Sequence, residues 1–305
     1  MRRPRLFIGL GIALHAVFFI LMLMGVEPFQ TFFYLFAWWT FIPVIGAINA
    51  QRGGNSLIFG ASQQLAWVTA YSLLVWLFFE IWNFWLHNWL YVNVLELTWL
   101  RWLAYAASFA TVLPAILEMD TLLGNAGLAR RVTGPVIRVS SRLLNGCVIA
   151  GLVMLTLVVL LPRYCFPLLW VGFIFILDPL VFRRDRLASF LGQAAKGSYA
   201  RLLRLMVAGL LCGLLWEFWN YWSGAKWIYA IPLFNFWKVF EMPLAGYLGF
   251  MPFALECYLF WQLLRLVKEA YAEMDRRIAP IIAALAAIYC ALVFNGIDHI
   301  TVISN

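Results

Sequence analysis

Long apolar runs separated by short polar clusters are the dominant pattern of this chain. A helix that crosses a lipid bilayer needs about 20 consecutive, mostly apolar residues. Nine segments meet this requirement, at residues 6–25, 31–50, 63–84, 102–122, 144–161, 166–182, 205–223, 243–264 and 279–298. The pattern predicts an all-α polytopic integral membrane protein with about nine transmembrane helices.

The composition excludes a water-soluble globular domain. Of the 305 residues, 65% are hydrophobic and 12% are charged, whereas soluble domains average roughly 45–50% and about 25%. So few charged side chains cannot cover the surface of a soluble fold of this size. The solvent of most of the chain is therefore the bilayer.

The basic residues are distributed unevenly over the loops between the predicted helices. With the N-terminus in the cytoplasm, 18 of the 22 Lys and Arg residues fall on the cytoplasmic side, as the positive-inside bias requires. We therefore expect a cytoplasmic N-terminus and an outer C-terminus. Because no organellar targeting signal precedes the first helix, we expect a bacterial inner membrane. The net charge of +8 then serves insertion and contact with anionic lipid, and no nucleic-acid partner is expected.

Neither a metal nor a cofactor is expected. The five cysteines and three histidines stand apart in distant segments, without the ligand spacing of zinc, haem or di-iron sites. Phosphate-cradling glycine loops and dinucleotide fingerprints are absent as well. The chemistry of any site must come from other polar side chains within the apolar runs.

Self-comparison reveals an internal duplication. Residues 80–85, EIWNFW, recur as EFWNYW after 137 residues. Downstream, Trp89, Tyr91 and a P-x-x-x-E recur after 138 residues, and upstream, residues 38–42, WWTFI, align with residues 170–174, WVGFI, after 132 residues. The match predicts two four-helix repeats, residues 1–125 and 126–270, followed by a C-terminal transmembrane helix in residues 271–305. Because each repeat has an even number of helices, both begin on the same side of the membrane. They are then related by an axis along the membrane normal.

Carboxylates and amides lie together inside the predicted helices. Asn83 and Asn220 follow Glu80 and Glu217 by three positions and so share their helix faces. Ionisable residues inside a span are costly and usually face a bundle interior or a cavity. We expect proton donors or acceptors, with an amide as the orienting group. The candidate catalytic residues are Glu217, Glu256, Asn220, Glu80, Asn83 and Glu118.

Aromatic rings beside these pairs can stabilise a cationic intermediate or bind a cationic ligand. The candidate substrate-binding residues of this kind are Trp82, Trp85, Trp219 and Trp222. Two structural alternatives remain open. The Glu/Asn pairs are also typical of interhelical hydrogen bonds, and an interfacial aromatic belt would account for Trp89, Trp99, Trp227 and Trp237.

Two segments, residues 86–100 and 223–240, are too polar and broken to span the membrane and too apolar for free loops. We interpret both as interfacial or re-entrant segments that cap a cavity on the outer side.

The ten residues from Glu241 to Phe250, EMPLAGYLGF, resemble the signature of the integral-membrane lycopene cyclases of carotenoid biosynthesis. That signature is E-x-P-x-E-E followed by aromatic residues, and Glu241, Pro243 and Phe250 match it. Ala245 and Gly246 occupy the positions of the paired acids. The resemblance implies a carotenoid-like or other isoprenoid ligand, no redox cofactor, and protonation by Glu217, Glu256 or Glu241, with Glu241 added to the substrate-binding candidates.

Three functional hypotheses follow. The first is a cofactor-independent, acid-catalysed enzyme that acts on a membrane lipid or isoprenoid in an aromatic-lined cavity containing carboxylates. The second is a proton-coupled transporter, because tandem repeats and intramembrane acids also occur in such proteins. The third is a membrane scaffold subunit without a site of its own. The substrate and the oligomeric state are left open.

Overall fold

The computed structural model describes residues 2–53, 55–60, 62–270 and 278–303. Within these residues, nine helices are long and apolar enough to cross a membrane, and they coincide with the nine predicted segments. The prediction of an all-α polytopic membrane protein is confirmed. Arg276 and Arg277, two of the predicted cytoplasmic cations, and the predicted start of the C-terminal section at residue 271 lie outside the described residues.

The first part of the chain forms α1 (Arg2–Leu23), α2 (Phe33–Arg52), α3 (Ser62–Leu86), β1 (Trp89–Val92), α4 (Thr98–Phe109) and α5 (Val112–Asn125). The second part begins with α6 (Ser141–Leu160), α7 (Pro162–Cys165), the 3-10 turn η1 (Phe166–Leu168), α8 (Leu169–Arg184), α9 (Phe190–Ala194) and α10 (Ala200–Trp222). It ends with β2 (Lys226–Tyr229), β3 (Lys238–Val239), β4 (Met242–Pro243), the 3-10 segment η2 (Leu244–Gly249), α11 (Phe250–Ala270) and α12 (Ala279–Ile300).

The fourth and eighth spans are interrupted, although each was predicted as one continuous helix. The fourth consists of α4 and α5, and the eighth of η2 and α11. Both breaks come just before a proline, Pro114 or Pro252, which the predicted repeat aligns. Proline has no backbone N–H and is readily accepted in the first turn of a helix. The two prolines therefore favour a fresh helix start at equivalent points.

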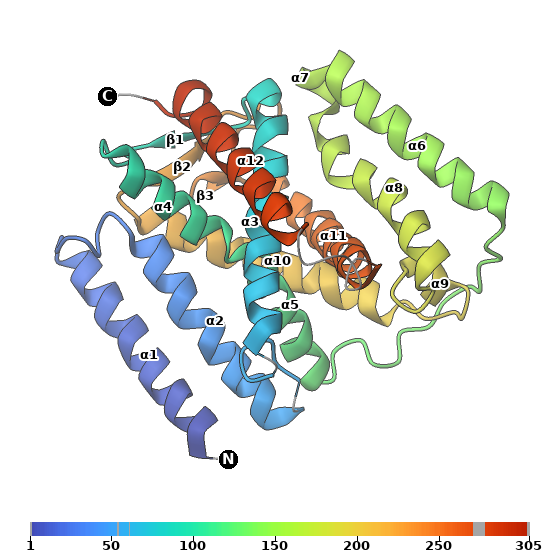
Figure 1. Cartoon of the computed structure of the whole chain (residues 1–305), viewed down its shortest axis with the longest axis horizontal. Helices are drawn as coiled ribbons and strands as arrows, with labels where there is room; N and C mark the ends of the chain where they lie inside the picture. The colour runs from blue at the N-terminus through green and yellow to red at the C-terminus, as the bar shows by residue number, and fades with distance from the viewer. Residues whose placement is uncertain (1, 54, 61, 271–277, 304–305) are drawn as a thin grey trace.

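The helices pack in pairs around a central group. α1 lies on α2 and α6 lies on α8, at opposite sides of the molecule, with α3, α10 and α11 between them and α12 against α3 (Figure 1). Gly209 allows α10 and α11 to approach closely, because a methyl group there would meet the carbonyl oxygen of Phe250. The small residue thus sets the spacing of the two central helices.

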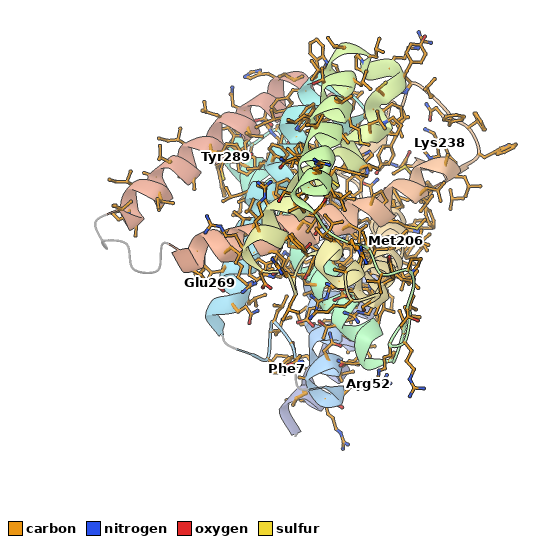
Figure 2. The ribbon with its side chains drawn as sticks, turned by 90° about the vertical axis from the view of Figure 1, so that its right-hand side faces the viewer. Phe7, Arg52, Met206, Lys238, Glu269 and Tyr289 are labelled. Carbon is orange, nitrogen blue, oxygen red and sulfur yellow. The ribbon has the colours of Figure 1, made fainter. Side chains whose placement is uncertain are left out.

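The connections that follow α1, α3 and α10, together with the end of α12, lie on one face of the molecule. We call it the strand face, because β1 and β2 lie there. There the Gly224 backbone N–H donates to Gln30 O at 2.8 Å, and the Tyr91 N–H donates to Thr301 O at 2.8 Å. The face therefore joins the ends of α1, α3, α10 and α12. Lys238, on the strand face, and Arg52, at the end of α2 on the opposite face, lie at opposite ends of the molecule (Figure 2).

A two-stranded antiparallel ribbon of β1 and β2 crosses the strand face. Trp89 pairs with Tyr229, Leu90 with Ile228, and Tyr91 with Trp227. The predicted repeat aligns Trp89 with Trp227 and Tyr91 with Tyr229, so the pairing is centred on two equivalent residues. This is the register expected for two units related by a two-fold axis. The division into repeats stays a prediction, which this register supports.

Candidate functional site

Two asparagines hold the strand ribbon onto the helices. The Asn83 amide donates to the Trp89 carbonyl at 2.8 Å and its oxygen accepts from the Trp89 N–H at 3.2 Å. Asn220 makes the same two bonds to Trp227, at 2.8 Å and 3.0 Å. Each asparagine side chain thus makes the two hydrogen bonds to a tryptophan backbone that a neighbouring strand would otherwise make. In this arrangement the two asparagines position β1 and β2 and therefore the aromatic side chains that these strands carry.

The two aligned glutamates lie directly beneath this ribbon. Glu80 Oε1 accepts hydrogen bonds from the Tyr91 hydroxyl at 2.5 Å, the Trp76 indole at 2.7 Å and the Trp89 indole at 3.1 Å. Glu217 Oε1 accepts one from the Tyr229 hydroxyl at 2.7 Å. Both carboxyl groups are fully buried. In each, Oε2 has no hydrogen-bond partner among the described residues.

The two tyrosines on the ribbon are hydrogen donors at neutral pH. Burial, reinforced by the neighbouring Glu80, raises the pKa of Tyr91 well above its usual value. Burial and Glu217 do the same to the pKa of Tyr229. Each phenol therefore keeps its hydrogen and directs it at a carboxyl oxygen.

A cavity of about 520 Å³ lies between the two parts of the chain, beside the strand ribbon. Both strands line it, so the predicted capping segments do border one cavity. Its walls are mainly apolar, with many aromatic rings among them, and come from both parts of the chain. The aromatic lining residues include Trp76, Trp89, Tyr91, Tyr105, Trp170, Trp216, Trp227, Tyr229, Phe250 and Phe253.

Glu80 and Glu217 are not among the lining residues of this cavity. The side chains that donate to them, Tyr91, Trp89 and Tyr229, stand between the carboxyl groups and the cavity. The predicted carboxylates are thus separated from the cavity by one layer of aromatic side chains. Of the lining groups bonded to them, the Tyr91 and Tyr229 hydroxyls can both donate and accept a hydrogen bond, whereas the Trp76 and Trp89 indoles only donate.

The charged groups that line the cavity are both ion-paired. Lys226 Nζ lies 2.7 Å from Glu241, and Arg101 lies 2.7 Å from Asp298. Glu241, a predicted substrate-binding residue, therefore neutralises a lining lysine. Arg101, Lys226 and Asp298 were missed by sequence reasoning because each stands at a helix or strand end, where solvated charges are ordinary.

Two unpartnered polar atoms belong to lining residues. Asn88 Oδ1, an acceptor, and Trp216 Nε1, a donor, are buried and have no partner among the described residues. Buried polar groups are nearly always hydrogen-bonded. These two atoms mark places where a ligand or water would form a hydrogen bond, and nothing in the sequence distinguishes them from other Asn and Trp residues.

The four predicted substrate-binding tryptophans lie elsewhere, since none of them is among the lining residues. Trp85 and Trp222 are exposed on the apolar surface, and Trp82 packs against Phe173. Trp219 is buried with its ring 4.7 Å from that of Trp38. The E-x-W-N-x-W repeat therefore contributes its acid and amide to the neighbourhood of the cavity, and its tryptophans to packing and the lipid surface.

Glu118, another predicted catalytic residue, lies near the opposite face and is hydrogen-bonded there. Its carboxylate accepts from the Asn49 amide at 2.6 Å, the Ser56 hydroxyl at 2.9 Å and the Leu57 N–H at 2.7 Å. Gly46 leaves room for it, because a methyl group there would lie 3.2 Å from Glu118 Oε1. These bonds tie the connection after α2 to α5.

Glu256, the aligned residue on α11, is fully buried, and neither carboxyl oxygen has a partner among the described residues. The equivalent connection after α8 is held by another acid. Asp178 accepts from the Phe190 N–H at 2.7 Å and the Leu191 N–H at 2.8 Å. The predicted repeat aligns Asp178 with Gly46, so the carboxylate has moved from one helix to another.

The described residues contain no group of three or more His, Cys, Asp or Glu side chains placed to hold a metal ion. No protein-family model, curated protein or solved structure matches the chain. Within the described residues, the molecule is an apolar multi-helix protein with aromatic clusters, buried carboxyl groups and one large aromatic cavity.

Proposed function

We propose that the protein binds an apolar membrane molecule, a lipid or an isoprenoid, in the aromatic cavity beside the strand ribbon. The observation that carries this proposal is the cavity itself, with about 520 Å³ of space. This volume falls within the usual range of small-molecule pockets, which are mostly apolar with few polar groups. Here those polar groups include the Tyr91 and Tyr229 hydroxyls, Asn88 Oδ1 and Trp216 Nε1, beside the ion-paired Arg101 and Lys226.

The isoprenoid class is favoured by the position of the cyclase-like segment. Met242, Pro243, Ala245, Gly246 and Phe250, which belong to that segment, line the cavity. A lycopene cyclase-like role therefore stays part of the proposal. Aromatic faces on several sides suit a polyene, and they would also stabilise a carbocation formed from it.

The reaction that we propose for such a ligand is acid-catalysed isomerisation or cyclisation. In the structure the Tyr229 hydroxyl donates to Glu217 Oε1. For the reaction this hydroxyl turns its hydrogen to a ligand double bond and gives up that proton, while its oxygen takes the proton of a neutral Glu217 carboxyl group, which becomes a carboxylate. A carbocation forms, rearranges, and loses a proton from a neighbouring carbon back along the same route. Tyr91 and Glu80 offer the same pair of groups in the first part of the chain. The step needs no cofactor, because no electrons are gained or lost.

The binding proposal is tested by filling the cavity. Ala104, on α4, lines the cavity, whereas Ala284, on α12, is exposed on the apolar surface. Protein carrying Ala104→Trp should lose an apolar molecule that co-purifies with the wild type, as measured by mass spectrometry of extracts. The matched control, Ala284→Trp, should retain it. Equal recovery from both variants would contradict binding in this cavity.

The catalytic proposal is tested in the host. A lipid or terpenoid species should disappear on deletion of the gene and return with the wild-type protein. It should not return with Glu217→Gln or Tyr229→Phe, provided that both variants reach the membrane in normal amounts. Full restoration by both variants would leave binding without this chemistry.

A second candidate function is proton-coupled transport, which the broken spans favour. Discontinuous helices at corresponding positions of two repeats are a feature of transporter binding sites, and the breaks before Pro114 and Pro252 are of this kind. Reconstituted vesicles distinguish the two functions. A transporter moves the bound molecule under an imposed pH gradient without changing its mass, whereas an enzyme changes its skeleton without a gradient.

A further inference from the structure

A second hollow of about 470 Å³ lies on the membrane-facing side of the molecule. We call it the histidine groove. It is formed by α1, α2 and α10 and is lined by Gly11, Ile12, His15, Ala16, Phe19, Thr40, Phe41, Val44 and Phe218. It shares no lining residue with the aromatic cavity. His15 and Thr40 are the polar residues of this lining.

The hydrogen bonds open to Thr40 favour one tautomer of His15. The Thr40 hydroxyl has two backbone carbonyls of its own helix as acceptors, that of Phe36 at 2.8 Å and that of Ala37 at 3.0 Å. A hydroxyl has a single hydrogen, and with that hydrogen on one of these carbonyls the Thr40 oxygen accepts from His15 Nδ1, 2.8 Å away. In the neutral ring Nδ1 therefore bears the hydrogen, and Nε2 bears a lone pair.

The lone pair of Nε2 has no protein partner among the described residues. His15 is half-buried, and its ring lies 5.4 Å from the Trp219 ring and 6.4 Å from the Phe33 ring. These contacts hold the imidazole against the groove wall. In this tautomer Nε2 is an acceptor in a hollow whose lining side chains, apart from His15 and Thr40, are apolar. A hydrogen-bond donor from the bilayer side would satisfy it.

The second part of the chain makes the same helix contact without any polar group. A methyl group on Gly11 would meet Val44 and the Thr40 carbonyl, and one on Gly151 would meet the aligned Ile176 and Gly172 carbonyl. Gly11 and Gly151 therefore occupy equivalent positions in the two helix pairs. Four residues further along each helix, His15 is then equivalent to Leu155.

In the second part, Leu155 lies over Gly172 and is buried. Leucine over glycine is thus sufficient to pack such a helix pair. The His15–Thr40 pair is not required for packing, and a polar pair within a span is costly. Its presence in the first part alone indicates a purpose beyond helix association.

We infer that the histidine groove binds a membrane-soluble alcohol or phenol, whose hydroxyl donates to His15 Nε2 while its apolar body lies along Phe19, Phe41 and Phe218. A donor-bearing ligand is required, because the groove presents an acceptor. An acyl chain or an ether gains only the apolar contacts. The inference does not depend on the aromatic cavity or on its chemistry.

The test uses photolabelling in phosphatidylcholine vesicles. The probes are a diazirine-bearing hexadecanol and its methyl ether, which differ in the hydroxyl hydrogen. The alcohol should label α1 and α2 peptides around His15 and Thr40 roughly fivefold more than the ether, the ratio expected for one hydrogen bond. Peptides of α6 and α8 around Leu155 and Gly172 provide an internal control and should show no preference. Equal labelling of the groove by both probes would overturn the inference.

Two variants connect the preference to the imidazole. His15→Phe keeps a ring against Trp219 and removes both nitrogens. The double variant His15→Leu/Thr40→Gly copies the contact that Leu155 and Gly172 already make. Both should retain the helical spectrum and size of the wild type and lose the preference for the alcohol. A preference that survives in either variant would place the hydroxyl elsewhere and refute the site.

Discussion

The two pairs of aligned glutamates have diverged to very different extents. Under the strand ribbon, Glu80 and Glu217 each accept a tyrosine hydroxyl and each keep one unpartnered oxygen. Near the opposite face, Glu118 is fully engaged, whereas Glu256 has no partner among the described residues. Sequence identity at aligned positions therefore preserved an arrangement in one place and not in the other.

The reason lies in what surrounds each carboxyl group. Glu80 and Glu217 are bonded by residues of their own repeat, on strands that Asn83 and Asn220 hold in the same way. Glu118 is bonded by the connection that follows α2, and in the second part Asp178 has taken over that connection. Glu80 and Glu217 keep the same hydrogen-bonding arrangement because the residues that donate to them are duplicated with them. Glu256 has lost the bonds that Glu118 makes because Asp178 now accepts from the equivalent connection.

The largest difference in stability is expected between Glu118→Leu and Glu256→Leu, the same substitution at the two aligned glutamates whose surroundings differ. Glu118→Leu leaves the Asn49 amide, the Ser56 hydroxyl and the Leu57 N–H without an acceptor and should lower the free energy of unfolding by about 4 kcal/mol. Glu256→Leu removes two unpaired oxygens and should change it by less than about 1 kcal/mol. Unfolding by detergent titration measures both. Equal losses would mean that Glu256 has partners of its own.

A smaller change in stability tests whether an acid at position 46 can replace Glu118, as Asp178 does in the second part. In a Glu118→Leu background, Gly46→Asp places a carboxylate where the second part has Asp178. A methyl group at position 46 would lie 3.1 Å from Ser56 Oγ, so the new acid is within reach of the same connection. We expect recovery of about 2 kcal/mol of the lost stability. Gly46→Asn is the control, and no recovery with Asp would contradict the exchange.

A smaller loss of stability is expected when the tyrosine hydroxyls that donate to Glu80 and Glu217 are removed. Tyr229→Phe removes the hydroxyl that donates to Glu217 and accepts from the Trp227 indole, and should cost about 1.5 kcal/mol. Tyr91→Phe should cost about half as much, because Glu80 keeps two indole donors. The same detergent titration compares them. A larger loss for Tyr91→Phe would show that the two carboxyl groups differ more than their bonds indicate.

The smallest effect is a pH dependence that separates the two faces. Tyr91 and Tyr229 have raised pKa values, so above about pH 10 the unfolded chain releases phenol protons that the folded chain keeps, and stability falls as pH rises. At the opposite face, burial opposes ionisation of Asp185, but the N–H groups of Ala188 and Leu187 and the Arg265 side chain outweigh it and lower its pKa.

Stability from Asp185 is therefore lost as pH falls below the ordinary carboxyl range. Asp185→Asn should remove the acid sensitivity and leave the alkaline loss unchanged. Unfolding titrations over a pH series, with phenolate absorbance to follow the tyrosines, check both halves. An alkaline loss that persists in a Tyr91→Phe/Tyr229→Phe variant would assign it to other groups.

Much of the fold was predictable because insertion into a bilayer is a property of local composition. A run such as residues 144–161 is apolar enough to span whatever surrounds it, and the structure has a helix there, Ser141–Leu160. The breaks before Pro114 and Pro252 were less predictable, since proline is also tolerated inside membrane helices when neighbours satisfy the freed backbone groups. The strand ribbon was missed, although W-L-Y-V and K-W-I-Y have the aromatic and β-branched character of short strands.

Sequence by itself determined the membrane class of this protein, its nine spans and the repeated acid–amide pairs, because hydropathy and spacing act over a few helical turns. Tertiary structure alone decided which oxygen atoms are paired, which aromatic rings face a cavity and which nitrogen of His15 is free. Each of those outcomes depends on contacts between distant segments, such as the Asn49 amide that meets Glu118 and the Thr40 hydroxyl that meets His15. Helical spacing does not encode such contacts.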